Sequence, residues 1–249
     1  MSEKRSLSVV ITAYDETDSL RRVFDKLDAV GGADEFLFVL ARRCSLDCAR
    51  TVKEICDEKP YCRRIVQTAY GFGNAVREAI DSVRGTHMLY WTADSGAADP
   101  EIFPELLRLY NRYPDKIITT SRWLDGEGYR GYTPARKLIN YVSQKTFRLM
   151  FRSQLTDFTN IIQIAPVDIY RRIRWEQTDF SFNAEMMFKL VKAGCEFIEV
   201  PSRNVERTEG KSHTTLRELV RYYPVIWKIF LSAKDDVIAP PDERTAIKE

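Results

Sequence analysis

The strongest constraint on the fold is a regular alternation, in the first half of the chain, of short β-branched runs with longer segments whose apolar residues recur at helical spacing. This pattern is typical of βαβ units, which build a mostly parallel, doubly wound sheet with helices on both faces. The expected strands span residues 7–12, 36–40, 64–67, 88–91 and 116–120, and the expected helices span residues 18–30, 46–58, 74–83 and 100–113.

The second half of the chain breaks this rhythm. A Gly/Tyr-rich loop at 125–133 precedes a long amphipathic helix at 135–151, and a mixed stretch from residue 156 leads to a helix at 183–193 and a strand at 197–200. With 249 residues, 44% of them apolar, the chain can fill one core. We therefore expect one domain over residues 1–235, followed by a Pro- and charge-rich tail, 236–249, that is disordered.

The composition excludes some functions. A formal net charge of +2 gives no electrostatic reason to expect a nucleic-acid partner. The N-terminal segment passes directly into a strand-like run too short for a signal peptide or a membrane span, which favours a cytoplasmic location. Four of the five cysteines lie close together but lack the C-x2-C spacing of structural zinc sites, so we interpret Cys44, Cys48, Cys56 and Cys62 as reduced thiols.

Candidate functional residues follow the expected strands, because ligands of doubly wound sheets lie beyond the carboxyl ends of the strands. Asp15, Glu16 and Thr17 follow the first strand, where helix capping is an equally ordinary role. Gly71 and Gly73 precede a helix, as they would either to let backbone N–H groups reach a phosphate or simply to supply positive φ.

The fourth expected strand ends in Thr92-Ala93-Asp94. A carboxylate in this place could hold a divalent cation against a pyrophosphate. An isolated Asp after a strand also commonly caps a turn.

In order and spacing, these motifs resemble the inverting family 2 glycosyltransferases, and within them the dolichyl-phosphate mannose synthase branch. That branch has P-x-Y-N-E, Gly-x-Gly-x-A, D-A-D and G-S-R in succession, and later D-x-T-S-G and R-x-x-G-x-S-K. The counterparts here are residues 12–16, 71–75, 92–94, 120–122, Arg136, 157–159, Glu185, Pro201 and 207–212.

The resemblance implies a GT-A-type, Rossmann-like fold with a nucleotide-binding half at about residues 1–122 and an acceptor half at about 123–235. It implies transfer of a hexose from a nucleoside-diphosphate sugar to a polyprenyl phosphate or a similar acceptor, with Mn²⁺ or Mg²⁺ as cofactor. The residues so implicated are Thr12, Tyr14 and Glu16 at the nucleoside, Gly71, Gly73 and Ala93 at the ribose and phosphates, Asp94 at the metal, and Arg122, Arg207, Ser212 and His213 at phosphates.

A general base is needed only if the acceptor oxygen is a hydroxyl rather than an ionised phosphate. Glu185 and Asp157 are the candidates for that case. The alternative for Glu185 is a surface carboxylate on an amphipathic helix.

Three departures from the branch concern charge. Where the family carries V-D-D-G-S-x-D, this chain has Arg42 and Arg43, which either point to solvent or supply charge near the pyrophosphate in place of the cation. Thr92 and Gly96 replace further oxygen ligands around Asp94, which weakens the case for a metal. His213 replaces a lysine and would make a phosphate contact pH-dependent unless it is an exposed turn residue.

The segment 216–233 is too polar to span a membrane. Its aromatic and basic residues suit a helix lying on a membrane surface, and equally a core-packing helix or a homo-oligomer contact. Two functional alternatives stay open: a glycosyltransferase acting on a soluble small molecule, and a degenerate GT-A protein that binds without catalysis. A nucleotidyltransferase would share the sheet but leave the segment 207–212 unexplained.

Overall fold

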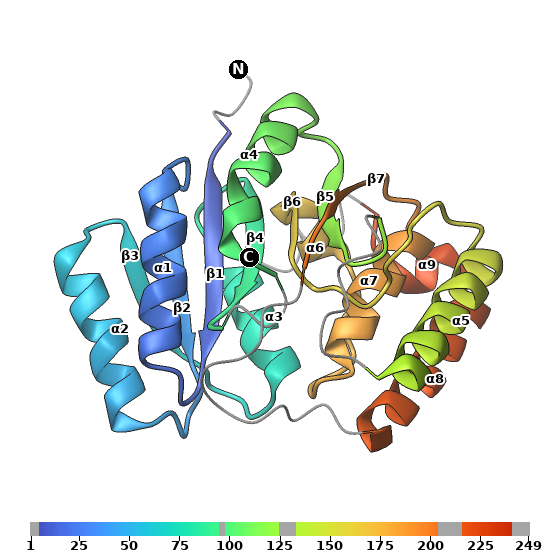
Figure 1. Cartoon of the computed structure of the whole chain (residues 1–249), viewed down its shortest axis with the longest axis horizontal. Coiled ribbons are helices and arrows are strands. Elements are labelled where there is room, and N and C mark those ends of the chain that lie inside the picture. The colour runs from blue at the N-terminus through green and yellow to red at the C-terminus, as the bar shows by residue number, and fades with distance from the viewer. Residues whose placement is uncertain (1–4, 95–97, 125–132, 204–215, 241–249) are drawn as a thin grey trace.

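A computed structural model describes residues 5–94, 98–124, 133–203 and 216–240 of the chain, with side chains of the last segment from Arg221. Its strands form a single seven-stranded sheet in the order β3-β2-β1-β4-β6-β5-β7 (Figure 1). Only β6 runs antiparallel to its neighbours, which confirms the expected mostly parallel α/β fold. The strands are β1 Leu7–Ala13, β2 Glu35–Leu40, β3 Cys62–Val66, β4 His87–Thr92, β5 Ile117–Ser121, β6 Gln163–Pro166 and β7 Phe197–Pro201.

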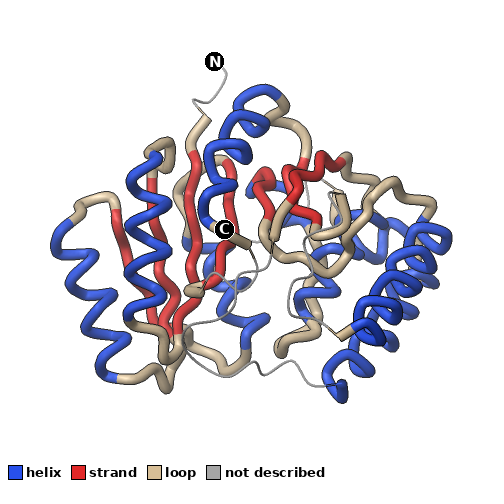
Figure 2. The backbone as a smooth tube through the Cα atoms, in the orientation of Figure 1, coloured by secondary structure: helices blue, strands red, loops and turns tan. Residues whose placement is uncertain are grey.

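Helices cover both faces of the sheet (Figure 2). One layer consists of α1 Asp18–Val30, α2 Leu46–Glu58 and α4 Phe103–Arg112, and the opposite layer consists of α3 Phe72–Ser82, α6 Val167–Arg172 and α7 Phe182–Lys192. Because both faces of β1 are covered, its apolar run is nearly continuous. Val9 packs toward the first layer and Val10 toward the second.

The sequence predicts the bounds of α1 and α2 correctly, because their apolar spacing and caps are local signals. Ser45, for example, caps α2 by accepting a hydrogen bond from the Cys48 N–H. The expected helix at 100–113 is a 3₁₀ turn, Pro100–Ile102, followed by α4. No expected element corresponds to β6 or α6, which are only four and six residues long.

Two long helices, α5 Pro134–Phe151 and α8 Leu216–Leu231, lie side by side at the end of the molecule beyond α7 (Figure 1). They share a third apolar cluster that contains Phe147, Phe158, Phe188 and Ile226. Among the described residues, no helix is both long enough and apolar enough to cross a membrane.

The packed part of the chain extends beyond residue 235, where the sequence interpretation placed the start of a tail. Helix α9, Lys234–Val237, follows α8, and Val237 is 1% exposed. Ile238 forms a β-bridge with Ile173. Residues 237–239 are therefore packed, whereas 241–249 lie outside the described residues.

Candidate active site

The sheet brings the candidate residues to one edge. Strands β1, β2 and β4 are parallel, and β5 points the same way because β6 between them is reversed. The residues after Thr92 and Ser121 therefore lie at the same edge, separated by one strand. Two interstrand spacings correspond to about 10 Å.

The loop after β1 is shaped by Glu16. Its carboxylate accepts hydrogen bonds from the backbone N–H groups of Tyr14 (2.8 Å) and Asp15 (3.2 Å). The ring of Tyr14 remains 48% exposed, and the Thr12 hydroxyl lies 2.8 Å from that of Tyr90. Tyr14 is thus available to a ligand, while Glu16 holds the loop.

The two arginines after β2 form an ordered cluster with Tyr70. The guanidinium carbons of Arg42 and Arg43 lie 4.7 and 5.4 Å from the centre of the Tyr70 ring, which is 56% exposed. Arg42 Nη1 also donates to the Thr68 carbonyl (2.9 Å). Glu78 holds the same loop by accepting from the Thr68 N–H (2.8 Å). Both arginines are therefore held on an aromatic ring at the ligand edge, and both side chains remain exposed.

Gly71 and Gly73 have a packing role that the sequence analysis did not identify. Gly71 has φ 107°, and a Cβ atom there would lie 2.2 Å from the Thr178 carbonyl oxygen. A Cβ atom at Gly73 would lie 2.6 Å from the Gln177 carbonyl oxygen, and the Gly73 N–H donates to Thr178 O (2.9 Å). The glycines thus admit the 177–178 segment against the start of α3, and this N–H is already committed.

Asp94 is 6% exposed and follows the buried Ala93. The Thr92 hydroxyl donates to the Asp94 backbone carbonyl (2.5 Å), so it serves the turn. Among the described residues, no group of three or more His, Cys, Asp or Glu could hold a metal ion, and Gly96 lies outside them. One carboxylate still fits a cation that arrives with substrate phosphates, the usual arrangement for Mg²⁺.

The cysteines are free thiols. Burial raises the pKa of Cys48 and Cys62 to about 12, so both are protonated at neutral pH.

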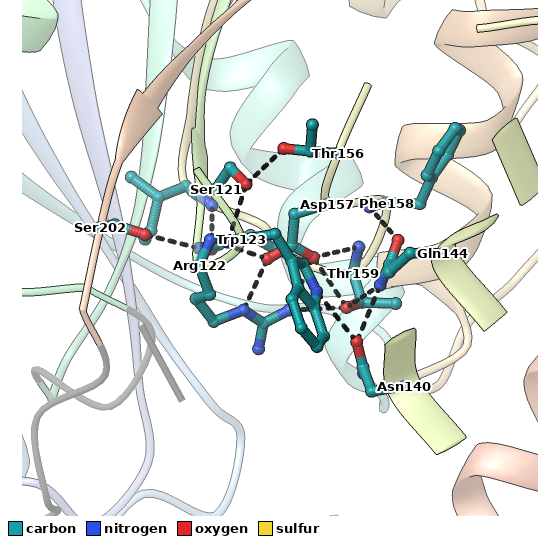
Figure 3. Close-up of polar contacts among 12 residues, drawn as sticks. Ser121, Arg122, Trp123, Asn140, Gln144, Thr156, Asp157, Phe158, Thr159 and Ser202 are labelled. Carbon is teal, nitrogen blue, oxygen red and sulfur yellow. Dashed lines mark hydrogen bonds and ion pairs between the residues drawn. The ribbon is translucent and has the colours of Figure 1, made fainter. Parts of the chain in front are cut away.

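Arg122 and Asp157 form a buried ion pair at this edge (Figure 3). Arg122 Nε and Nη2 donate to the two carboxylate oxygens of Asp157 at 2.7 and 2.8 Å, and the Arg122 backbone N–H adds a third bond (3.1 Å). Asp157 is fully buried, which by itself would raise its pKa, but the charge and hydrogen bonds of Arg122 prevail and lower the pKa. The carboxylate is therefore ionised and its oxygens are occupied.

A shell of polar side chains fixes this pair (Figure 3). Thr159 donates through its N–H to Asp157 Oδ1 (3.0 Å), and the buried Gln144 of α5 accepts from the Phe158 N–H (2.8 Å). Gln144 Nε2 and the Trp123 indole N–H both donate to Asn140 Oδ1, at 3.1 and 3.2 Å. Thr159 falls within the 157–159 counterpart noted from the sequence, whereas Trp123, Asn140 and Gln144 were not anticipated. The signal for Gln144 was a polar side chain at helical spacing with the core residue Phe147.

Glu199 on β7 is a further residue that the sequence analysis missed. Its carboxylate accepts from the backbone N–H groups of Thr156 (2.8 Å) and Asp157 (3.0 Å). The Thr156 hydroxyl in turn lies 2.6 Å from that of Ser121. Burial, followed by the charge of Asp157, raises the pKa of Glu199 despite these hydrogen bonds. The carboxylate holds the loop segment at Thr156 and Asp157.

Glu185 is fully buried, which corrects its interpretation as a surface carboxylate. It forms an ion pair with Lys189 one turn later (2.8 Å) and accepts from the N–H groups of Glu176 (2.8 Å) and Gln177 (2.9 Å). It therefore anchors the segment that packs on Gly71 and Gly73. Since both Asp157 and Glu185 are buried and engaged, the geometry argues against either acting as a general base.

Arg207, Ser212 and His213, the remaining candidates at phosphates, lie outside the described residues.

A mostly parallel sheet with one reversed strand, carrying an acidic residue beyond β4, defines a protein with a GT-A-type fold. A family model described as "Glycosyl transferase family 2" matches residues 8–174. This match covers more than half of the chain, and the chain belongs to that family.

Two relatives illustrate the likeness. The chain is 30% identical over 132 residues to an undecaprenyl-phosphate mannosyltransferase of Micrococcus luteus, a match that covers 52% of this chain and 54% of that protein. The chain thus spans about half the length of this curated relative.

Solved structures of glucosyl-3-phosphoglycerate synthase from Mycobacterium tuberculosis share the fold. The complex with Mn²⁺, uridine diphosphate and phosphoglyceric acid has a TM-score of 0.68 at 14% identity and covers 92% of this chain and 78% of that one. The complex with Mg²⁺ and uridine diphosphate has a TM-score of 0.66 at 15% identity, covering 92% and 79%. Identities this low show similarity of fold alone.

Proposed function

We propose that this chain is an inverting hexosyltransferase that moves a sugar from a nucleoside-diphosphate donor to a polyprenyl phosphate. The observation that carries the proposal is the placement of Asp94 and Arg122 at one edge of a family 2 fold, one strand apart. An acid there suits the cation side of a diphosphate, and a guanidinium suits a phosphate.

Arg122 is the better fixed of these two residues. The bidentate pair with Asp157 fixes the guanidinium plane, and 12% of the Arg122 side chain stays exposed. A fixed guanidinium loses little conformational entropy when it binds a phosphate oxygen. The names of the two relatives support this role. One is an undecaprenyl-phosphate mannosyltransferase, and the other is a synthase whose solved structure contains phosphoglyceric acid, so both names include a phosphate-bearing molecule.

The state of the two buried carboxylates favours a phosphate acceptor over an alcohol. An ionised phosphate oxygen can attack the anomeric carbon directly, forming the new C–O bond while the bond to the nucleoside diphosphate breaks and that diphosphate leaves. Such an acceptor has no proton to remove, so it needs no general base. Asp157 and Glu185 are then free to serve structure, as their contacts indicate.

On the donor side, Asp94 would hold a divalent cation, which when bound neutralises charge on the departing diphosphate. The cluster of Arg42, Arg43 and Tyr70 would add an aromatic surface and positive charge at the same edge. Guanidinium groups only donate hydrogen bonds, so the base edge they contact must present acceptors.

The test is a transfer assay that combines GDP-, UDP-, CDP- and dTDP-sugars with a polyprenyl phosphate and, in parallel, with small soluble phosphates and alcohols. We expect turnover with one donor, an inverted anomeric configuration by NMR, and a loss of kcat/KM of at least about 100-fold in Asp94→Ala. The control is Asp57→Ala, an exposed acid that pairs with Lys53 on α2.

Turnover that Asp94→Ala leaves intact would refute the role of this acid. Turnover only with a soluble acceptor would support the second candidate, a small-molecule glycosyltransferase. Binding of a donor without turnover of any acceptor would support a degenerate protein.

A further inference from the structure

The outward face of α5 is unusually apolar. Leu138, Val142 and Leu149 occur at positions that share one side of a helix, and they are 62%, 54% and 81% exposed. Ile139 beside them is 59% exposed. The opposite side of α5 carries the buried Gln144 and Phe147. Within the described residues nothing covers the outward side, so α5 exposes more apolar surface than a solvated helix normally does.

Helix α8, which adjoins α5, carries a second row of exposed apolar side chains. Tyr223, Trp227 and Leu231 follow one another at one-turn spacing and are 41%, 51% and 76% exposed. The Tyr223 hydroxyl lies 3.0 Å from the hydroxyl of Ser143, and its ring lies 6.3 Å from that of Phe147, so the two helices adjoin here. We call these seven exposed side chains, Leu138, Ile139, Val142 and Leu149 of α5 with Tyr223, Trp227 and Leu231 of α8, the α5–α8 apolar face.

The charges around this face distinguish between its possible occupants. Helix α5 carries Arg136, Lys137, Lys145 and Arg148 and no acidic residue. A second copy of the chain docked on the same face would bring these positive charges together, which is unfavourable. An anionic lipid surface would be attracted to them, while Trp and Tyr side chains are suited to the boundary between headgroups and acyl chains.

We propose that the α5–α8 apolar face binds the surface of an anionic membrane, with both helices lying in the plane of the headgroups. The inference rests on the proposed function in one respect, because a polyprenyl phosphate is held in a membrane. The two sides of α5 then have complementary tasks. Its outward side rests on lipid, and its inward side, through Gln144 and Asn140, contacts the shell of Arg122. A lipid phosphate at the headgroup level is thereby brought toward the guanidinium.

Vesicle flotation with the full chain tests the docking directly. We expect the chain to float with phosphatidylglycerol-containing vesicles, less so with pure phosphatidylcholine, and the bound fraction to fall as salt is raised. The double variant Leu138→Ser and Leu149→Ser should bind at least about tenfold more weakly. The control is Leu46→Ser with Val30→Ser, which changes two exposed apolar residues (83% and 40%) on α2 and α1, at the other end of the sheet (Figure 1).

A second variant, Lys137→Gln with Lys145→Gln, keeps the apolar side chains and should lose mainly the preference for anionic vesicles. Flotation of the leucine variant equal to that of the unaltered chain would overturn the proposal. So would a concentration-dependent dimer, seen by analytical ultracentrifugation, that the leucine variant abolishes while the chain fails to float.

Transfer to a short-chain, water-soluble polyprenyl phosphate separates this inference from the proposed function. The leucine variant should keep that activity, since its changes lie on the outward side of α5. A chain that floats but transfers no sugar would retain the membrane face and refute the enzyme. A chain that transfers sugar but never floats would do the reverse.

Discussion

The ligand edge of the sheet differs between its two ends. Beyond β1 to β3, the candidate side chains are exposed: Tyr14 and Tyr70 keep about half of their surface, and Arg42 and Arg43 lie on the Tyr70 ring. Around β5, β7 and α7, the charged residues are buried in pairs, with Asp157 and Glu185 fully covered. At the first end, beyond β1 to β3, the functional groups are directly accessible to a ligand. At the second end, the carboxylates hold Arg122 and the 176–178 segment in place.

This difference separates two uses of charge. An exposed cation on a ring contributes about 0.5–1 kcal/mol and is free to change partner when a ligand arrives. A buried ion pair is costly to break, because the remaining charge has no solvent. We therefore expect substitutions at the first end to affect binding, and substitutions at the second end to affect folding before they affect binding.

The largest effect should come from Asp157→Ala. It leaves the Arg122 guanidinium without its two hydrogen bonds to a carboxylate in a mostly buried position, which should lower the free energy of unfolding by about 3–5 kcal/mol. Urea denaturation measures this loss. Arg42→Ala is the matched change at the exposed end and should leave the urea midpoint nearly unaltered.

A loss below about 1 kcal/mol in Asp157→Ala would show that the pair is as expendable as a surface salt bridge. The contrast between the two ends would then disappear. Asp157→Asn refines the test, because its shape is retained while the charge is removed.

The next largest effect concerns Gly71, where the 177–178 segment packs against the start of α3. Gly71→Ala would put a Cβ atom 2.2 Å from the Thr178 carbonyl and require a side chain at φ 107°. We expect it to destabilise the protein by about 2–3 kcal/mol, combining backbone strain and overpacking. Thermal unfolding with and without a nucleoside diphosphate measures this, with Gly31→Ala as control, because Gly31 also has positive φ but open space around its Cβ position.

If Gly71 served only to approach a phosphate, Gly71→Ala would instead keep its stability without ligand and lose only the stabilisation that the nucleotide provides. The packing role would then be wrong.

How far the sequence could predict these features depends on the range of the signal. The bounds of α1 and α2 follow from apolar spacing and neighbouring caps, all local. Strand β6 has four residues and lies between β4 and β5 only because of the tertiary fold, so no local pattern marked it. Arg122 and Asp157 were each identified as candidates, but they are 35 residues apart, and neither motif predicts that they form an ion pair.

Burial was the quantity that the sequence analysis could least anticipate. Glu185 lies on a helix whose spacing allowed a surface position, yet Lys189 and two backbone N–H groups from the preceding loop bury it. Glu199 is the polar residue in a short strand of apolar residues, a pattern that also fits a solvent-facing acid. Its partners Thr156 and Asp157 are over forty residues away in the sequence. A buried carboxylate is defined by these distant donors rather than by its neighbours in sequence.

The smallest expected effect is a pH dependence within the buried end itself, where two adjacent acids have pKa values displaced in opposite directions. Asp157 has a lowered pKa, so its contribution to stability is present above the value of the unfolded chain, about 4, and is lost as pH falls through the folded pKa. Glu199 has a raised pKa, so its contribution to stability is full below the unfolded value, about 4.5, and is lost as pH rises through the folded pKa.

Glu199→Gln should therefore flatten the decline of unfolding free energy above about pH 4.5 and leave the acid-side loss in place, as measured by urea denaturation at a series of pH values. The control Glu196→Gln removes an exposed acid whose pKa is lowered by Lys116, so it should alter only the acid side. An unchanged slope above pH 4.5 in Glu199→Gln would mean that the loop at Thr156 and Asp157 is held by hydrogen bonds alone, and that burial of Glu199 does not raise its pKa.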